Sequence, residues 1–179
     1  LYDALLKSTI FGPAGMAVCR FLNIMLGASG AAAAEVLRTW PQRNVAAALA
    51  VYVLGVTWFA RNETGEASRR QLSAGLGLSA VGILMNLQMM FSLKSAGPPA
   101  TGAAIALGLI GCNILLRGFR AIRVGQPKIL QQTVGFLLLN IIFLDAAVTF
   151  GLTGSAPLSA AIVILVIPAT VLRKIIPMS

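Results

Sequence analysis

The chain has 179 residues, of which 58% are hydrophobic and only 11% are charged. A soluble domain carries roughly 25% charged residues, so this composition excludes an ordinary soluble protein and predicts an all-α, polytopic helical membrane protein. The net charge of +9 would suggest nucleic-acid binding in a soluble protein, but here we attribute it to Lys and Arg anchoring loops on one side of a bilayer. We therefore expect no nucleic-acid partner. The chain has no histidine, which excludes His-based metal sites and catalytic triads.

The apolar pattern predicts six membrane-spanning helices in one domain that covers residues 1–179. A short amphipathic segment over residues 1–11 precedes the first helix. Helices of about 17–25 residues match the hydrocarbon core of a bilayer, and the expected spans come close to that length. A tight break at Gly97-Pro98-Pro99 separates the third expected helix from the fourth. A basic stretch at Arg117–Lys128 separates the fourth from the fifth. In chain order the helices are expected at Gly12–Leu26, Asn44–Ala60, Leu72–Leu93, Thr101–Leu116, Ile129–Leu152 and Leu158–Leu172.

The distribution of basic residues predicts the orientation of these helices. Six crossings return the chain to the side on which it starts. That side then holds ten Lys and Arg residues and the opposite side three, while Arg20 lies within the first helix. The asymmetry follows the positive-inside rule. We expect both termini and the loop after Arg61 on the cytoplasmic side of an inner, cytoplasmic membrane.

Small residues recur at helical spacing in two of the expected helices. Ala104, Gly108 and Cys112 follow one another at intervals of four, and Gly75 and Ser79 share the same spacing. Stripes of this kind allow helices in lipid to approach closely. We interpret both stripes as helix-packing faces.

Arg20 and Asn23 lie three residues apart near the middle of the first helix, where a charge costs at least about 2.5–3.5 kcal/mol without a partner. Asp145 is the only acidic residue within an expected helix, so an Arg20–Asp145 pair is the simplest partnership. One interpretation is a structural ion pair. The other places Arg20 and Asn23 on the wall of a polar cavity that receives an anionic ligand. Amides elsewhere would extend this lining or bond between helices: Asn86, Gln88, Asn113 and Asn140.

Glu63 and Glu66 lie three residues apart in the loop after the second helix, with Arg61, Arg69 and Arg70 beside them. Mg²⁺ is commonly bound by one or two carboxylates together with phosphate oxygens of a substrate. Arginines can take the remaining phosphate charge as bidentate donors. The pair is a candidate metal site, and the alternative is an ordinary solvated loop.

Arg117, Arg120 and Arg123 recur every three residues at the end of the fourth expected helix. They could line a funnel for phosphate groups. Anchoring of the helix on the cytoplasmic side explains them equally well.

Three segments resemble the UbiA superfamily of intramembrane prenyltransferases. The opening LYDALLKSTIFGPAGMAVCRFLNIMLGAS is similar to the middle of those proteins, where a Tyr and a Lys precede a helix that carries an Arg. YVLGVTWFARNETGEASRRQL resembles the second acidic motif of the family, and QQTVGFLLLNIIFLDAAVTFG is similar to the divergent EboC-like branch. Glutamates three apart stand where the family has aspartates four apart.

The resemblance implies that the six helices match the last six of a nine-helix bundle, with a first acidic motif upstream of Leu1, so that this stretch alone would be inactive. It implies Mg²⁺-dependent transfer of a polyprenyl group from an isoprenoid diphosphate to a lipophilic, aromatic or other, acceptor. By position, Glu63 and Glu66 would be the catalytic, metal-binding residues. Residues that would bind the diphosphate or line the cavity are Lys7, Arg20, Asn23, Tyr52 and Arg61.

The sequence is also compatible with two other functions. A UbiA-like protein that has lost the chemistry would bind or move an isoprenoid lipid within the bilayer. An unrelated six-helix transporter is the third hypothesis, although the chain shows no internal repeat of the kind found in many transporters.

Overall fold

The structure is a computed structural model that describes residues 11–28, 40–61, 68–93 and 97–175. All of the regular structure in these ranges is helical. In chain order the elements are α2 (Phe11–Ala28), α4 (Trp40–Arg61), α5 (Arg69–Ser92), α6 (Pro98–Val124), α7 (Pro127–Thr153), α8 (Ala156–Ile164) and α9 (Val166–Ile175).

Five of these helices, α2, α4, α5, α6 and α7, are long and apolar enough to cross a membrane. Each overlaps one of the first five helices expected from the sequence. Because every backbone N–H and C=O must be satisfied in lipid, long apolar helices are the form such a chain takes in a bilayer. The protein is therefore a helical, membrane-embedded protein.

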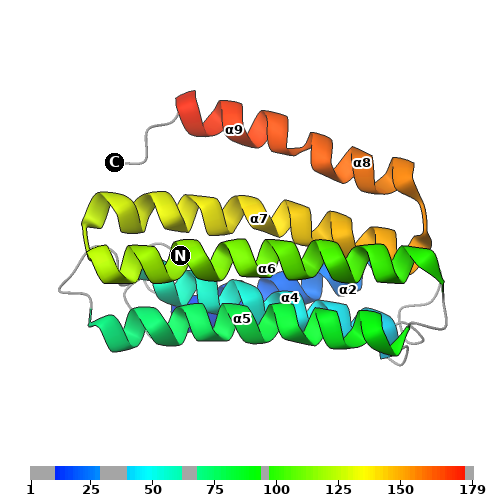
Figure 1. Ribbon diagram of the computed structural model, residues 1–179, viewed down its shortest axis with the longest axis horizontal. Coiled ribbons are helices and arrows are strands. Elements are labelled where there is room, and N and C mark those ends of the chain that lie inside the picture. Colours follow the sequence, from blue (N-terminus) through cyan, green and yellow to red (C-terminus); the bar gives the residue numbers. More distant parts are fainter. Residues whose placement is uncertain (1–10, 29–39, 62–67, 94–96, 176–179) are drawn as a thin grey trace.

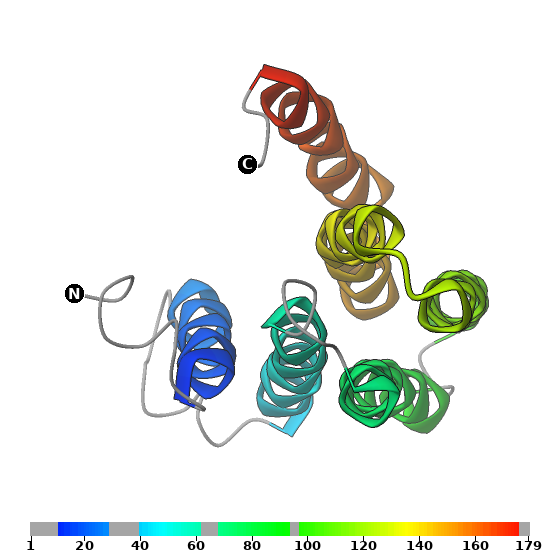
Figure 2. The ribbon, with the colours of Figure 1, turned by 90° about the vertical axis from the view of Figure 1, so that its left-hand side faces the viewer.

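The helices lie side by side, and α4, α5, α6 and α7 run in alternating directions, whereas α9 continues in the direction of α8 (Figure 1). Helices α4, α5, α6 and α7 form a four-helix bundle in which each packs on the next and α4 also packs on α7. The remaining helices flank this bundle: α2 packs on α4, and α8 packs on α7 (Figure 2). Between these two flanks, alongside α4 and α7, the bundle has a concave side.

Glycine and proline set the ends of α6 and α7. Gly97, with a φ of 93°, precedes α6, and Pro98 and Pro99 occupy its first two positions, as expected from the sequence. Gly125, with a φ of 66°, ends α6 in the left-handed conformation that glycine adopts most readily. Pro127 then begins α7, so a two-residue connection joins the two longest helices.

The predicted end of the fourth helix at Leu116 was wrong by two turns, because α6 continues to Val124. The basic stretch was interpreted as a loop, yet arginine is a good helix former. Gly118, Ala121 and Ile122 are buried and continue the core-facing stripe of α6 through the arginines. The helix therefore ends at the first glycine after that stripe.

The sixth expected helix is interrupted, because α8 ends at Ile164 and α9 begins at Val166. Pro168 explains the break. It has no backbone N–H to donate to the carbonyl of Ile164, and its ring crowds that carbonyl. Leu165 instead donates its N–H to the Ile162 carbonyl at 3.1 Å, which tightens the chain at the break.

The closest helix contact in the bundle joins α4 to α5 through glycines. A Cβ built on Gly82 would lie 2.6 Å from the Ala48 oxygen and 2.6 Å from the Tyr52 nitrogen, and one on Gly75 would lie 2.8 Å from the Phe59 nitrogen. The prediction that Gly75 and Ser79 form a packing face is thus confirmed. The two backbones touch because these positions lack bulk.

The second small-residue stripe does not form a packing face along its length. Ala104 is buried, Gly108 is half-buried with no atom near its missing side chain, and Cys112 is exposed. A spacing of four drifts by about 40° per step on a helix, so the stripe turns away from the core. The face that α6 buries instead follows Ala100, Ala103, Leu107, Gly111, Ile114, Gly118 and Ala121.

One end of the bundle collects basic residues. Arg61 ends α4, Arg69 and Arg70 begin α5, and Arg123 lies in the last turn of α6. By the positive-inside rule this end is predicted to face the cytoplasm.

A cysteine-accessibility experiment tests this orientation. In a background in which Cys19 and Cys112 are replaced by serine, Thr64→Cys should react with an impermeant maleimide only after the membrane is permeabilised. Thr153→Cys, at the opposite end of α7, serves as the control and should react in intact cells. Labelling of Thr64→Cys in intact cells would reverse the orientation.

Candidate functional site

The residues predicted for catalysis lie at or beyond the edges of the described structure. Lys7, Glu63 and Glu66 fall outside the described residues. Arg61 is exposed and is the last residue of α4, so the segment with the two glutamates begins at the basic end of the bundle.

Arg20 of α2 and Asp145 of α7 form an ion pair, in which the guanidinium donates to a carboxylate oxygen of Asp145. The two side chains are 23% and 27% exposed. The predicted Arg20–Asp145 partnership is therefore confirmed. It joins α2 directly to α7 across the concave side of the bundle.

Asn23 does not share the position of Arg20, because it is exposed. Residues three apart on a helix diverge by about 60°, whereas residues four apart diverge by about 40° in the other direction. The face of α2 that turns inward continues from Arg20 to Ile24 and Ala28. The prediction that Asn23 lines a cavity with Arg20 is not met.

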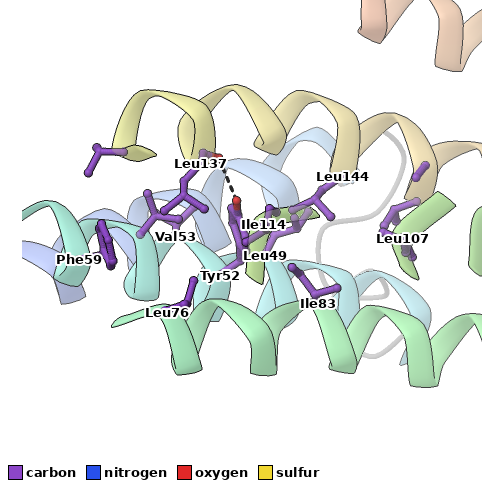
Figure 3. Close-up of a cluster of buried hydrophobic side chains, with 14 of the residues drawn as sticks. Leu49, Tyr52, Val53, Phe59, Leu76, Ile83, Leu107, Ile114, Leu137 and Leu144 are labelled. Atoms are coloured by element: carbon purple, nitrogen blue, oxygen red, sulfur yellow. Dashed lines mark hydrogen bonds between the residues drawn. The ribbon is translucent and has the colours of Figure 1, made fainter. Parts of the chain in front are cut away.

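Tyr52 is a core residue rather than a cavity wall. Its side chain is fully buried, and its hydroxyl donates a hydrogen bond of 2.9 Å to the Leu137 carbonyl (Figure 3). Leu49, Val53 and Leu144 surround it within the cluster between α4 and α7. The predicted role of Tyr52 in lining the cavity was wrong, because its one polar atom is already satisfied by α7.

The four amide side chains proposed to extend the polar lining do not line a cavity together with Arg20. Asn86 and Asn140 are buried, and each donates to the carbonyl four residues earlier in its own helix, at 3.2 Å and 2.8 Å. Gln88 and Asn113 are exposed. None of the four borders the cavity described next.

A cavity of about 390 Å³ lies on the concave side of the bundle, between α2, α4, α7 and α8. We call it the chamber. Its walls are mainly aliphatic, and its polar groups are Gln42, Asp145 and Thr149. The Oε1 atom of Gln42 is buried and has no hydrogen-bond partner within the described part of the chain. The aliphatic lining consists of Ile24, Ala28, Val45, Leu49, Val148, Leu152, Ile162 and Leu165.

Sequence reasoning missed Gln42 and Thr149. Gln42 lies between Pro41 and Arg43 and therefore looks like part of a polar helix end in the sequence. It borders the chamber only because α2 packs on α4 and α8 packs on α7. Chemically, the chamber suits the apolar body of an amphiphile, with Gln42 as an acceptor for a hydroxyl or amide on that body.

The chamber and the basic end of the bundle lie at different heights. Gln42, Val45 and Leu49 lie in the first half of α4, whereas Arg61 is its last residue. The twelve residues from Leu49 to Arg61 correspond to about 18 Å along the helix axis. A ligand that contacts both must therefore be long.

The described residues do not form a metal site. They contain no group of three or more His, Cys, Asp or Glu residues that could hold an ion. Asp145 is the only acidic residue in the described ranges, and its carboxylate is paired with Arg20. The prediction of Mg²⁺ therefore rests on Glu63 and Glu66 alone.

Comparisons of the chain with protein-family models, with curated proteins and with solved structures find no match.

Proposed function

We propose that the protein is a UbiA-like intramembrane prenyltransferase, which moves a polyprenyl group from an isoprenoid diphosphate to a lipophilic acceptor. The proposal rests on the sequence resemblance. The observation that supports it is the apolar chamber of about 390 Å³ on the concave side of the helical bundle, well separated along the helix axis from an arginine-rich end. A long amphiphile with an anionic head fits that arrangement.

The diphosphate would lie at the basic end. The guanidinium of Arg61 and the amine of Lys7 would bind it and neutralise phosphate charge. The prenyl chain would extend along α4 into the chamber, about 18 Å from Arg61. There the aliphatic walls replace water around the chain, which is the main source of affinity for such a ligand. The Arg20–Asp145 pair would hold α2 against α7 and so keep the chamber wall in place.

The reaction would break the bond between C1 of the prenyl group and the diphosphate oxygen, with the electron pair leaving on the diphosphate. The acceptor then bonds to C1 of the allylic cation and loses a proton. Cationic side chains at the leaving oxygen favour this step, and exclusion of water protects the cation from hydrolysis. Mg²⁺ on Glu63 and Glu66 would neutralise further charge on the diphosphate.

The second candidate function is binding or movement of an isoprenoid lipid without chemistry. One observation favours it: Asp145, the one carboxylate that the described residues bring to the chamber, is already paired with Arg20. The chamber itself therefore offers a binding surface, and all chemistry would have to occur at the basic end.

The test compares variants in membranes that contain the full protein. Isoprenoid diphosphates of several chain lengths are added with Mg²⁺, and the release of diphosphate and the formation of prenylated product are measured. Glu63→Gln combined with Glu66→Gln should lower both by at least about 100-fold, the usual size of a lost electrostatic contribution. Glu35→Gln makes the same chemical change in the connection between the first two helices and should leave turnover unchanged.

The outcomes separate the two functions. Undiminished turnover in the double variant would remove Glu63 and Glu66 as the metal-binding pair. Stoichiometric binding of an isoprenoid with no diphosphate release, in wild type and double variant alike, would establish the second function instead.

A further inference from the structure

The outer groove between α6 and α7 contains a second cavity, of about 380 Å³, which the proposed function does not use. Arg117 and Arg120 of α6 line it together with Gln132 of α7, and Val124 and Ile129 contribute apolar wall. We call it the arginine groove. It lies at the basic end of the bundle, in the last turns of α6 and the first turns of α7.

Arg117 is held in place within this groove. Its Nε donates to the side-chain oxygen of Asn113 at 3.1 Å, and its guanidinium carbon lies 4.2 Å from the centroid of the Phe136 ring. Both contacts orient the planar guanidinium before any ligand arrives, and they leave its terminal N–H groups to face a ligand. An arginine that only anchors a helix needs neither contact.

Arg120 lies one turn further along the same face of α6 and lines the same cavity, whereas Arg123 does not line it. The three-residue repeat seen in the sequence therefore separates into two arginines that converge and one that does not. Two guanidinium groups beside an amide and an aliphatic wall form a site for a phosphate that is attached to an apolar body.

We infer that the arginine groove binds the phosphate of an anionic phospholipid from the leaflet at the basic end. Basic pockets between membrane helices on the cytoplasmic side are a known way to bind such headgroups. Arg117 and Arg120 would contact the phosphate oxygens, and Val124 and Ile129 would contact the start of the acyl chains. This inference does not depend on the prenyltransferase proposal.

The test measures binding of phosphatidylglycerol to purified protein in detergent by native mass spectrometry. Detergent removes the field of the bilayer, so general attraction between basic loops and an anionic surface does not contribute. Arg117→Gln and Arg120→Gln should each weaken the one-to-one adduct by about tenfold, the size of a charge-assisted hydrogen bond. Arg123→Gln removes the same charge three residues away and should change binding by less than about twofold.

One further variant and two further ligands distinguish a specific lipid site from a loss of charge or of fold. Arg117→Lys retains the charge and the fold but loses the planar contact with Phe136, so it should also bind the lipid more weakly than wild type. Phosphatidylcholine should bind more weakly than phosphatidylglycerol, and inorganic phosphate should not displace the lipid at equal concentration. Equal losses in the Arg117, Arg120 and Arg123 variants, no loss in any of them, or displacement by inorganic phosphate would overturn the assignment.

Discussion

Replacing Asp145 by leucine should destabilise the protein by about 2.5–3.5 kcal/mol, the cost of an unpaired arginine in the middle of a membrane helix. The reason is that Arg20 of α2 has its ion-pair partner only in Asp145 of α7 among the described residues. The loss should appear as a lower midpoint of thermal unfolding in a bilayer mimetic, and as separation of α2 from α7 while α2 still packs on α4.

A double variant separates pairing from packing. Arg20→Leu combined with Asp145→Leu removes both charges, and it should recover most of the stability that the Asp145 variant loses. Asn23→Leu, on the exposed side of the same helix, provides the control and should be close to neutral. If the double variant were as unstable as Asp145→Leu alone, the two charges would not stabilise each other.

Replacing Gly82 by alanine should cost about 1–3 kcal/mol, because the added methyl group has no space. Its Cβ would lie 2.6 Å from the Ala48 oxygen and 2.6 Å from the Tyr52 nitrogen, both backbone atoms of α4. Backbone atoms of a helix cannot rotate aside, so α4 and α5 would have to separate. Loss of this contact would also disturb the Tyr52 hydrogen bond to α7.

The matched control for this variant is Gly77→Ala, in the same helix on the opposite face. No atom lies within 4 Å of a Cβ built on Gly77. The better helix propensity of alanine should make this variant neutral or more stable by up to about 1 kcal/mol. Unfolding curves in detergent compare the two variants directly. Equal shifts for both would show that helix propensity, and not the α4–α5 contact, sets the stability.

Several features of the fold were predictable because their causes are local or are imposed by the bilayer. Proline and glycine at Gly97-Pro98-Pro99 mark the start of α6 whatever packs around them. Pro168 is an equally local signal for the interruption between α8 and α9, but the continuous hydrophobic run around it favours one unbroken helix. The Arg20–Asp145 pair followed from elimination, since no other acidic residue lies in an expected helix.

The candidate site was predictable only in part, because its basic end and its chamber depend on different physical effects. The basic residues at one end follow from the rule that orients helices in membranes. The chamber follows from how α2 and α8 cover α4 and α7, which depends on helix rotation. Glu63 and Glu66 lie outside the described residues, so their role stays a prediction.

Composition and pattern alone were enough to predict a membrane protein of long helices, the positions of most of these helices, and Asp145 as the simplest partner of Arg20. These features depend on composition and on the cost of exposing backbone or charge to lipid. The side of each helix that faces inward became clear only from the packing of the folded chain. That choice placed Tyr52 in the core, Asn23 outside it, Gln42 at the chamber, and Arg117 with Arg120 in one groove. In lipid both faces of a helix are apolar, so hydrophobicity does not fix its rotation, and close packing at Gly75 and Gly82 does.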